Sequence, residues 1–168
     1  MKLILALSFL LTSFIALAGD HNMTNFKGGD VELKAYDHAV AGAVKDFLIF
    51  ASLDEATGVT TFTAKKEGKV TNLEIKKLAS GRFGVEESTF SVLFKKLVRE
   101  ENKFIFTVNG EDIEVDVKAD DFINNHYINP AYTFHFKNKD LTVKMEDGEA
   151  CYNFSAHLIA MILTAYSL

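Results

Sequence analysis

The sequence has few of the residues that fasten or interrupt a chain: one cysteine, one proline and no tryptophan in 168 residues. Because Cys151 is the only cysteine, no disulfide can form within the chain. Small secreted eukaryotic domains usually carry disulfides, so the absence of disulfides favours a bacterial protein. The chain must therefore be stabilised by a hydrophobic core of its own.

Motifs of common enzymes are also missing. There is no G-x-S-x-G elbow for a hydrolytic serine, no Walker loop and no G-x-G-x-x-G. The five histidines match no metal template such as H-x-H or H-x-x-x-H. The formal net charge of −5 gives no electrostatic footprint for nucleic acid. We therefore expect no cofactor, and no nucleic acid among the partners.

Residues 1–18 have the pattern of a secretory signal peptide. Lys2 precedes an apolar run over residues 3–17, and the small residues Ala16 and Ala18 form an A-x-A end. A retained membrane anchor is the alternative, but the short apolar run favours cleavage. We expect a mature chain of residues 19–168, secreted or periplasmic, that folds as one β-rich domain.

The C-terminal segment, residues 155–168, is apolar on every side of a helical wheel. Ten of its fourteen residues are apolar and none is charged. Such a helix must be buried, and at 1.5 Å per residue it spans roughly 21 Å, too short to cross a bilayer. We predict a core helix over about residues 152–167 and no transmembrane span in the mature chain. A cleaved GPI-anchor signal is the alternative explanation of the tail.

From residue 59 onward the pattern is one amphipathic strand after another. Residues 59–65 and 69–77 flank a tight turn that contains Gly68. A two-residue turn at Asn109-Gly110 places Phe106 opposite Ile113. A turn at Asn138-Lys139 would place Phe136 opposite Leu141, Phe134 opposite Val143 and Tyr132 opposite Met145. In both hairpins the apolar residues then share one face.

The N-terminal part of the domain is harder to interpret. Residues 20–30 are polar and predict an exposed lead-in, and residues 31–36 alternate as a strand does. Residues 37–52 allow two readings. Val40, Val44 and Phe47 have helical spacing, whereas residues 47–51 favour a strand.

Together these patterns predict a mainly β fold. We expect an antiparallel meander of about eight to ten strands that forms a barrel or a strongly curved sheet around the C-terminal apolar helix. This layout resembles that of the tubby, LURP-one and scramblase group. The resemblance concerns the order of elements across the mature chain and includes no shared motif, so it implies no binding residue.

Phenylalanine is abundant, with thirteen residues after position 18. Most belong to the core, and a surplus would line an apolar pocket. The two hairpins place four rings on one sheet face, and these are the candidate ligand-binding residues: Phe104, Phe106, Phe134 and Phe136.

The polar segment 119–130 holds weak candidates for a metal or proton-transfer site, namely Asp120, Asp121 and His126. A solvated loop explains them as well, so no metal site is assigned. His135 is expected on an exposed sheet face. His157 is expected to be a buried neutral imidazole bonded to a backbone carbonyl.

These observations favour an exported, non-enzymatic domain that binds a protein partner or a small apolar ligand. Two alternatives remain open at the level of sequence. One is a GPI-anchored surface protein whose tail is removed, and the other is a hydrolase or metal-dependent enzyme that uses His126 with Asp120 or Asp121.

Overall fold

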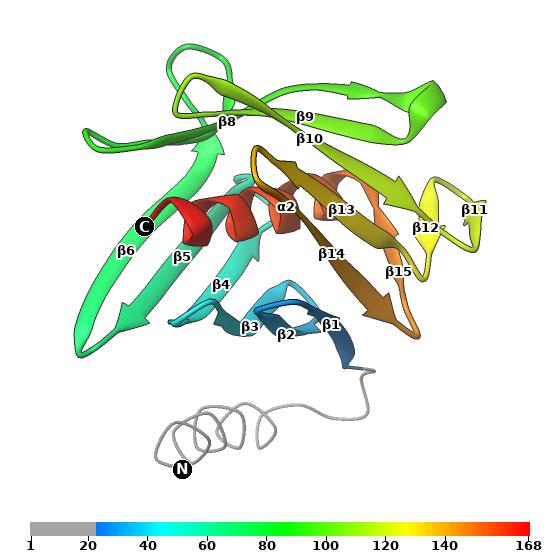
Figure 1. Ribbon diagram of the computed structural model, residues 1–168, viewed down its shortest axis with the longest axis horizontal. Helices are drawn as coiled ribbons and strands as arrows, with labels where there is room; N and C mark the ends of the chain where they lie inside the picture. The colour runs from blue at the N-terminus through cyan, green and yellow to red at the C-terminus, as the bar shows by residue number, and fades with distance from the viewer. Residues whose placement is uncertain (1–22) are drawn as a thin grey trace.

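The computed structural model describes residues 23–168 (Figure 1). The signal peptide predicted for residues 1–18 lies outside this range. The barrel strands are β1 (Thr24–Gly28), β2 (Val31–Tyr36), β3 (Ala39–Val44), β4 (Phe47–Asp54), β5 (Val59–Lys66), β6 (Lys69–Lys77), β7 (Phe83–Glu86), β8 (Ser91–Val98), β9 (Lys103–Val108), β10 (Glu111–Lys118), β13 (Ala131–Phe136) and β14 (Lys139–Glu146). A short 3-10 helix, Arg99–Glu101, joins β8 to β9.

Twelve antiparallel strands close into a barrel in the order β1-β14-β13-β10-β9-β8-β7-β6-β5-β4-β3-β2. The first strand closes the barrel, because β1 pairs with β14 on one side and β2 on the other. A second sheet is formed by β11 (Asp121–Ile123), β12 (His126–Ile128) and β15 (Glu149–Cys151). The predicted fold class is therefore confirmed, with twelve barrel strands where the patterns indicated eight to ten.

The helix α2 (Tyr152–Ser167) lies inside this barrel (Figure 1). Every residue from Leu158 to Ala165 is at most 2% exposed. Cys151 is the N-cap of the helix, and its Sγ accepts a hydrogen bond from the Phe154 backbone N–H at 3.4 Å. Its apolar residues on all sides find partners because strands surround it on all sides. Within residues 23–168, no helix has the length and hydropathy that a bilayer crossing requires.

Two segments of the N-terminal part are strands. The prediction of an exposed lead-in over residues 20–30 is wrong, because residues 24–28 form β1 and Phe26 is 0% exposed. The segment with two readings forms the strands β3 and β4, so the strand reading of residues 47–51 is confirmed and the helix is wrong. Val40 and Val44 are four residues apart, a spacing that fits both a helix and one face of a strand. Both side chains point into the barrel, at 3% and 0% exposure.

Of the two predicted hairpin registers, the one at Asn109-Gly110 is confirmed and the one at Asn138-Lys139 is wrong. Phe106 pairs with Ile113, as the Asn109-Gly110 turn predicts. In the other hairpin Phe134 pairs with Leu141, so the register is shifted by two residues from the predicted one. The turn is Lys137-Asn138. A shift of two keeps every side chain on its face, so hydrophobic alternation did not reveal it.

Candidate functional site: an opening between β6 and β7

The wall of the barrel is incomplete between β6 and β7. Strand β6 pairs with β5 at seven positions, from Thr60↔Ile75 to Lys66↔Lys69. On its other side it pairs with β7 at two positions only, Lys76↔Gly84 and Lys77↔Phe83. The β5–β6 hairpin and the β7–β8 hairpin therefore diverge beyond this junction, as Figure 1 shows.

The turn between β5 and β6 determines which backbone groups of β6 face the opening. Glu67 and Gly68 both have positive φ, 48° and 80°, as in a two-residue type I′ turn. The flanking residues of such a turn form a hydrogen-bonded pair, and the pattern alternates along the strands. Counting from Lys69, the N–H and C=O groups that point away from β5 belong to Val70, Asn72 and Glu74. Within residues 23–168 no strand pairs with this edge.

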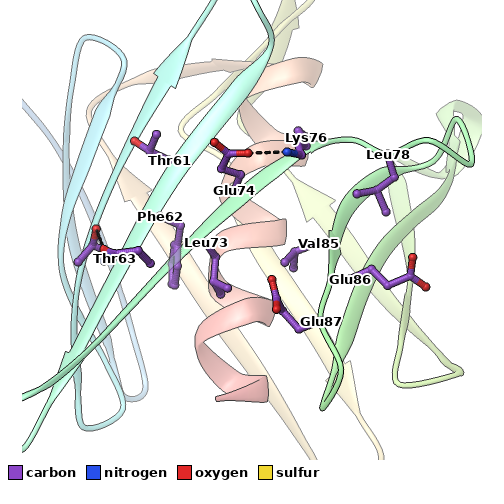
Figure 2. Close-up of a pocket in the computed structure, with 11 residues that line it drawn as sticks. Thr61, Phe62, Thr63, Leu73, Glu74, Lys76, Leu78, Val85, Glu86 and Glu87 are labelled. Carbon is purple, nitrogen blue, oxygen red and sulfur yellow. Dashed lines mark hydrogen bonds and ion pairs between the residues drawn. The ribbon is translucent and has the colours of Figure 1, made fainter.

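A cavity of about 660 Å³ occupies the opening (Figure 2). Its apolar part includes Phe62 and Val85, which are 0% and 2% exposed, and the half-buried Leu73. These side chains belong to the barrel interior, and of the three only Leu73 is partly exposed to the opening. The full lining is Thr61, Phe62, Thr63, Asn72, Leu73, Glu74, Lys76, Leu78, Val85, Glu86 and Glu87.

The charged residues of the lining are mostly acidic. Glu74 and Lys76 form an ion pair, with Oε2 and Nζ 2.5 Å apart. Glu86 and Glu87 are exposed and form no ion pair with any residue in 23–168. Three carboxylates against one ammonium leave the opening with a net negative charge, which favours a basic partner.

The four phenylalanines predicted to bind a ligand lie elsewhere. Phe104, Phe106 and Phe134 are buried in the core, at 0–1% exposure. Phe136 is half-buried and stacks on Tyr166 of α2, with ring centroids 5.1 Å apart. None of these rings lines the opening. The ligand-binding role predicted for them stays a prediction.

The weak metal candidates are held by local contacts. Asn129 Nδ2 donates to Asp120 Oδ2 at 3.0 Å, and Asp121 Oδ1 accepts from the next backbone N–H. His126 Nδ1 lies 2.9 Å from the carbonyl oxygen of Asn124. Asp121 begins β11 and His126 begins the antiparallel β12, so the two lie at opposite ends of this short hairpin. Within residues 23–168 no three His, Cys, Asp or Glu side chains are grouped to hold a metal ion.

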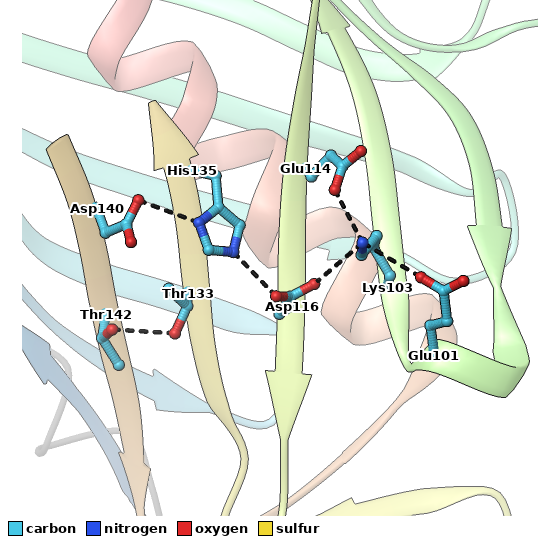
Figure 3. Close-up of polar contacts among 8 residues, drawn as sticks. All are labelled: Glu101, Lys103, Glu114, Asp116, Thr133, His135, Asp140 and Thr142. Atoms are coloured by element: carbon cyan, nitrogen blue, oxygen red, sulfur yellow. Dashed lines mark hydrogen bonds and ion pairs between the residues drawn. The ribbon is translucent and has the colours of Figure 1, made fainter. Parts of the chain in front are cut away.

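His135 is on the outer sheet face, as predicted, but its partners were not foreseen. Its Nε2 lies 2.9 Å from Asp116 Oδ2 and its Nδ1 lies 3.0 Å from Asp140 Oδ1 (Figure 3). The hydrogen bond to Asp116, followed by that to Asp140, raises the pKa of His135 above its ordinary value. The protonated ring donates to both carboxylates and so ties together β10, β13 and β14.

Lys103 continues this network on the same face. Its ammonium lies 2.8 Å from Glu114 Oε2, 3.2 Å from Glu101 Oε2 and 3.8 Å from Asp116 Oδ1. Hydrogen bonds to Glu114 and Glu101 raise the pKa of Lys103, so it stays charged. Figure 3 shows that every charged residue of this network pairs with a residue of opposite charge. This indicates that the network has a structural role.

The opening therefore combines a strand edge and carboxylates that are unpaired within residues 23–168 with an apolar floor, whereas the other candidate groups are held by contacts within the fold. Comparison of the chain with protein-family models, with curated proteins and with solved structures found no match.

Proposed function

We propose that this chain is an exported, non-enzymatic binding domain that takes an extended segment of a partner protein as an added strand on β6. The observation that carries the proposal is the outward-facing backbone of Val70, Asn72 and Glu74 beside an open cavity. The signal-peptide pattern of residues 1–18 supports export, to the periplasm or the medium.

Strand addition uses groups that β6 already presents. An extended segment gains main-chain hydrogen bonds along a free edge, and pockets for alternate side chains supply specificity. Residues 70–74 span about 17 Å at about 3.3 Å per residue, which is enough for a segment of about five residues. Its inward side chains would contact Leu73 and Leu78, the partly exposed apolar residues of the lining.

The surroundings of the edge define the chemistry of the segment. The apolar floor favours Val, Ile or Leu at alternate positions, and the carboxylates of Glu86 and Glu87 favour Lys or Arg between them. Lys69 and Lys77 lie at the two ends of β6, and lysines on a sheet edge discourage pairing with an identical edge. A partner with a basic, β-prone segment therefore fits better than a second copy of this chain.

The test is selection from a displayed library of random peptides, followed by affinity measurement on two matched variants. Val70→Pro removes one outward N–H, and an edge position tolerates proline in the folded state. Val70→Thr is the control, because it keeps the N–H and the strand propensity. We expect selected peptides to alternate apolar and basic residues, and to bind Val70→Pro at least about tenfold more weakly than Val70→Thr.

Hydrogen exchange provides the second readout. The amides of Val70, Asn72 and Glu74 are expected to exchange fast in the free protein and to become protected in the complex. Peptides that bind both variants equally, or that leave these amides unprotected, would contradict strand addition. A library that yields no binder would contradict it as well.

A further inference from the structure

A second cavity, of about 370 Å³, lies where the first turns of α2 meet the barrel wall. Its volume is near the lower end of the range for small-molecule sites. The helix contributes Asn153, Ala156 and His157, and the wall contributes two half-buried rings, Phe83 and Phe94. The remaining lining residues are Thr57, Gly58, Lys77 and Gly81. None of these nine residues carries a carboxylate.

His157 contributes a buried ring to this cavity, and one of its two nitrogens, Nε2, has no hydrogen-bond partner within residues 23–168. The residue is 5% exposed, and its Nδ1 lies 2.7 Å from Thr60 Oγ1. The Phe83 ring approaches the imidazole edge-on, with centroids 4.5 Å apart. In residues 23–168 every fully buried side-chain nitrogen or oxygen has a hydrogen-bond partner. Among these residues Nε2 has no such partner, so it is not fully enclosed by them, and the space that His157 lines is this cavity.

The contact with Thr60 decides what Nε2 offers to a ligand. Burial lowers the pKa of His157 to about 4, so the ring is neutral near pH 7 and carries one proton. The buried Thr60 hydroxyl proton needs an acceptor, and within residues 23–168 the imidazole Nδ1 is its one side-chain partner, so we infer that the hydroxyl donates to Nδ1. With Nδ1 as acceptor, the ring proton resides on Nε2. His157 thus presents a fixed N–H donor to the cavity.

The other polar groups around the cavity also favour an anion. Lys77 is exposed, and its ammonium forms no ion pair within residues 23–168. Lys77 lies directly opposite Phe83 in the sheet, on the same face, and Phe83 contacts His157. The first turn of α2 adds the positive end of the helix dipole near Asn153.

The structure assigns to this cavity a small carboxylic acid with an aromatic or branched apolar body. The carboxylate accepts from Nε2 of His157 and from the ammonium of Lys77, and the apolar body packs on Phe83 and Phe94. The lining of this cavity shares no residue with that of the opening beside β6, so this inference does not depend on the proposed peptide site.

The test is titration of the folded protein with phenylacetate, hydrocinnamate and isocaproate, each compared with its primary amide. We expect at least one acid to bind with a dissociation constant of about 1 mM or tighter. The matching amide should bind about tenfold more weakly, because it lacks the charge that Lys77 recognises. Long-range nitrogen–proton NMR should place the ring proton of His157 on Nε2 and show this signal shifting as the acid binds.

Two neighbouring lysines supply matched variants. Lys77→Met removes the cation of the cavity, whereas Lys76→Met removes the adjacent cation, which pairs with Glu74 outside it. Binding should weaken about tenfold in Lys77→Met and stay unchanged in Lys76→Met. Equal binding of acid and amide, equal loss in the two variants, or no binding of any acid at about 1 mM would overturn the inference. A ring proton found on Nδ1 would overturn it too.

Discussion

The imidazole of His157 and the hydroxyl of Thr60 join the central helix to the barrel wall, with Nδ1 and Oγ1 2.7 Å apart. A second buried contact, between Ser155 Oγ and Tyr132 OH at 2.8 Å, joins the same helix to strand β13. A helix that is apolar on every side has no preferred rotation from hydrophobic packing alone. These two buried polar contacts therefore favour one rotation of α2 inside the barrel, and the hydrogen bond from Tyr166 OH to Asp30 near its C-terminal end adds to them.

Replacing Thr60 by valine tests this account. The variant keeps the shape of the side chain but leaves a buried ring nitrogen without its partner, so we expect a loss of about 1–3 kcal/mol of unfolding free energy. Thr61→Val is the control, because Thr61 faces outward on the same strand and a change there should stay within about 0.5 kcal/mol. Urea unfolding of both variants measures the difference. Equal stabilities would mean that the Thr60 contact contributes nothing.

His157 should also make the fold sensitive to acid. Its pKa in the folded state, about 4, lies below the ordinary value of 6.5, so the unfolded chain binds more protons between these values. The stability due to this group is complete above pH 6.5 and falls by about 2–3 kcal/mol as the pH drops towards 4. NMR titration of the ring should show no protonation at pH 5.5 in the folded protein. A midpoint at or above 6.5 would refute the burial argument.

His135 has the opposite dependence on pH. Its folded-state pKa is raised, so its contribution is complete below pH 6.5 and is lost as the pH rises through the folded-state pKa. Because the side chain is 37% exposed, the effect on stability should be a few tenths of a kcal/mol. Asp116→Asn and Asp140→Asn should both lower the pKa of His135, and Asp116→Asn should lower it more. NMR titration of the ring in the three proteins checks this order.

The sequence predicted the architecture well because the strongest patterns in it are large and repeated. Alternating apolar residues indicated the strands, and the apolar C-terminal segment indicated the buried helix. The Asn109-Gly110 turn placed Phe106 opposite Ile113 correctly, because Asn and Gly are favoured at positive φ and both adopt it, at 52° and 85°.

Local sequence patterns did not predict two kinds of feature: those that depend on the register of a hairpin, and those that depend on a strand edge without a partner strand. The register predicted for the β13–β14 hairpin would place His135 opposite Thr142, whereas the observed register places it opposite Asp140. Because the predicted register was wrong by two residues, the ion pair between His135 and Asp140 could not be predicted. The opening beside β6 was missed for a different reason. Residues 69–77 alternate as any strand does, and nothing local indicates how many positions the next strand along the chain will pair.

Removal of residues 155–168 distinguishes two explanations of this segment, a core helix and a processed anchor signal. The truncation takes five large apolar side chains out of the barrel: Leu158, Ile159, Met161, Ile162 and Leu163. At about 1.5–3 kcal/mol each, they contribute about 10 kcal/mol, as much as the net stability of a typical domain.

We expect the truncated chain to lose its cooperative unfolding transition and to bind dyes that recognise exposed apolar surface. Ile162→Ala in the full chain is the graded comparison, because it should cost about 2–5 kcal/mol while the barrel stays folded. Calorimetry and near-UV circular dichroism measure both. A truncated chain that unfolds as cooperatively as the full one would show that the barrel stands without α2, and would favour the anchor signal.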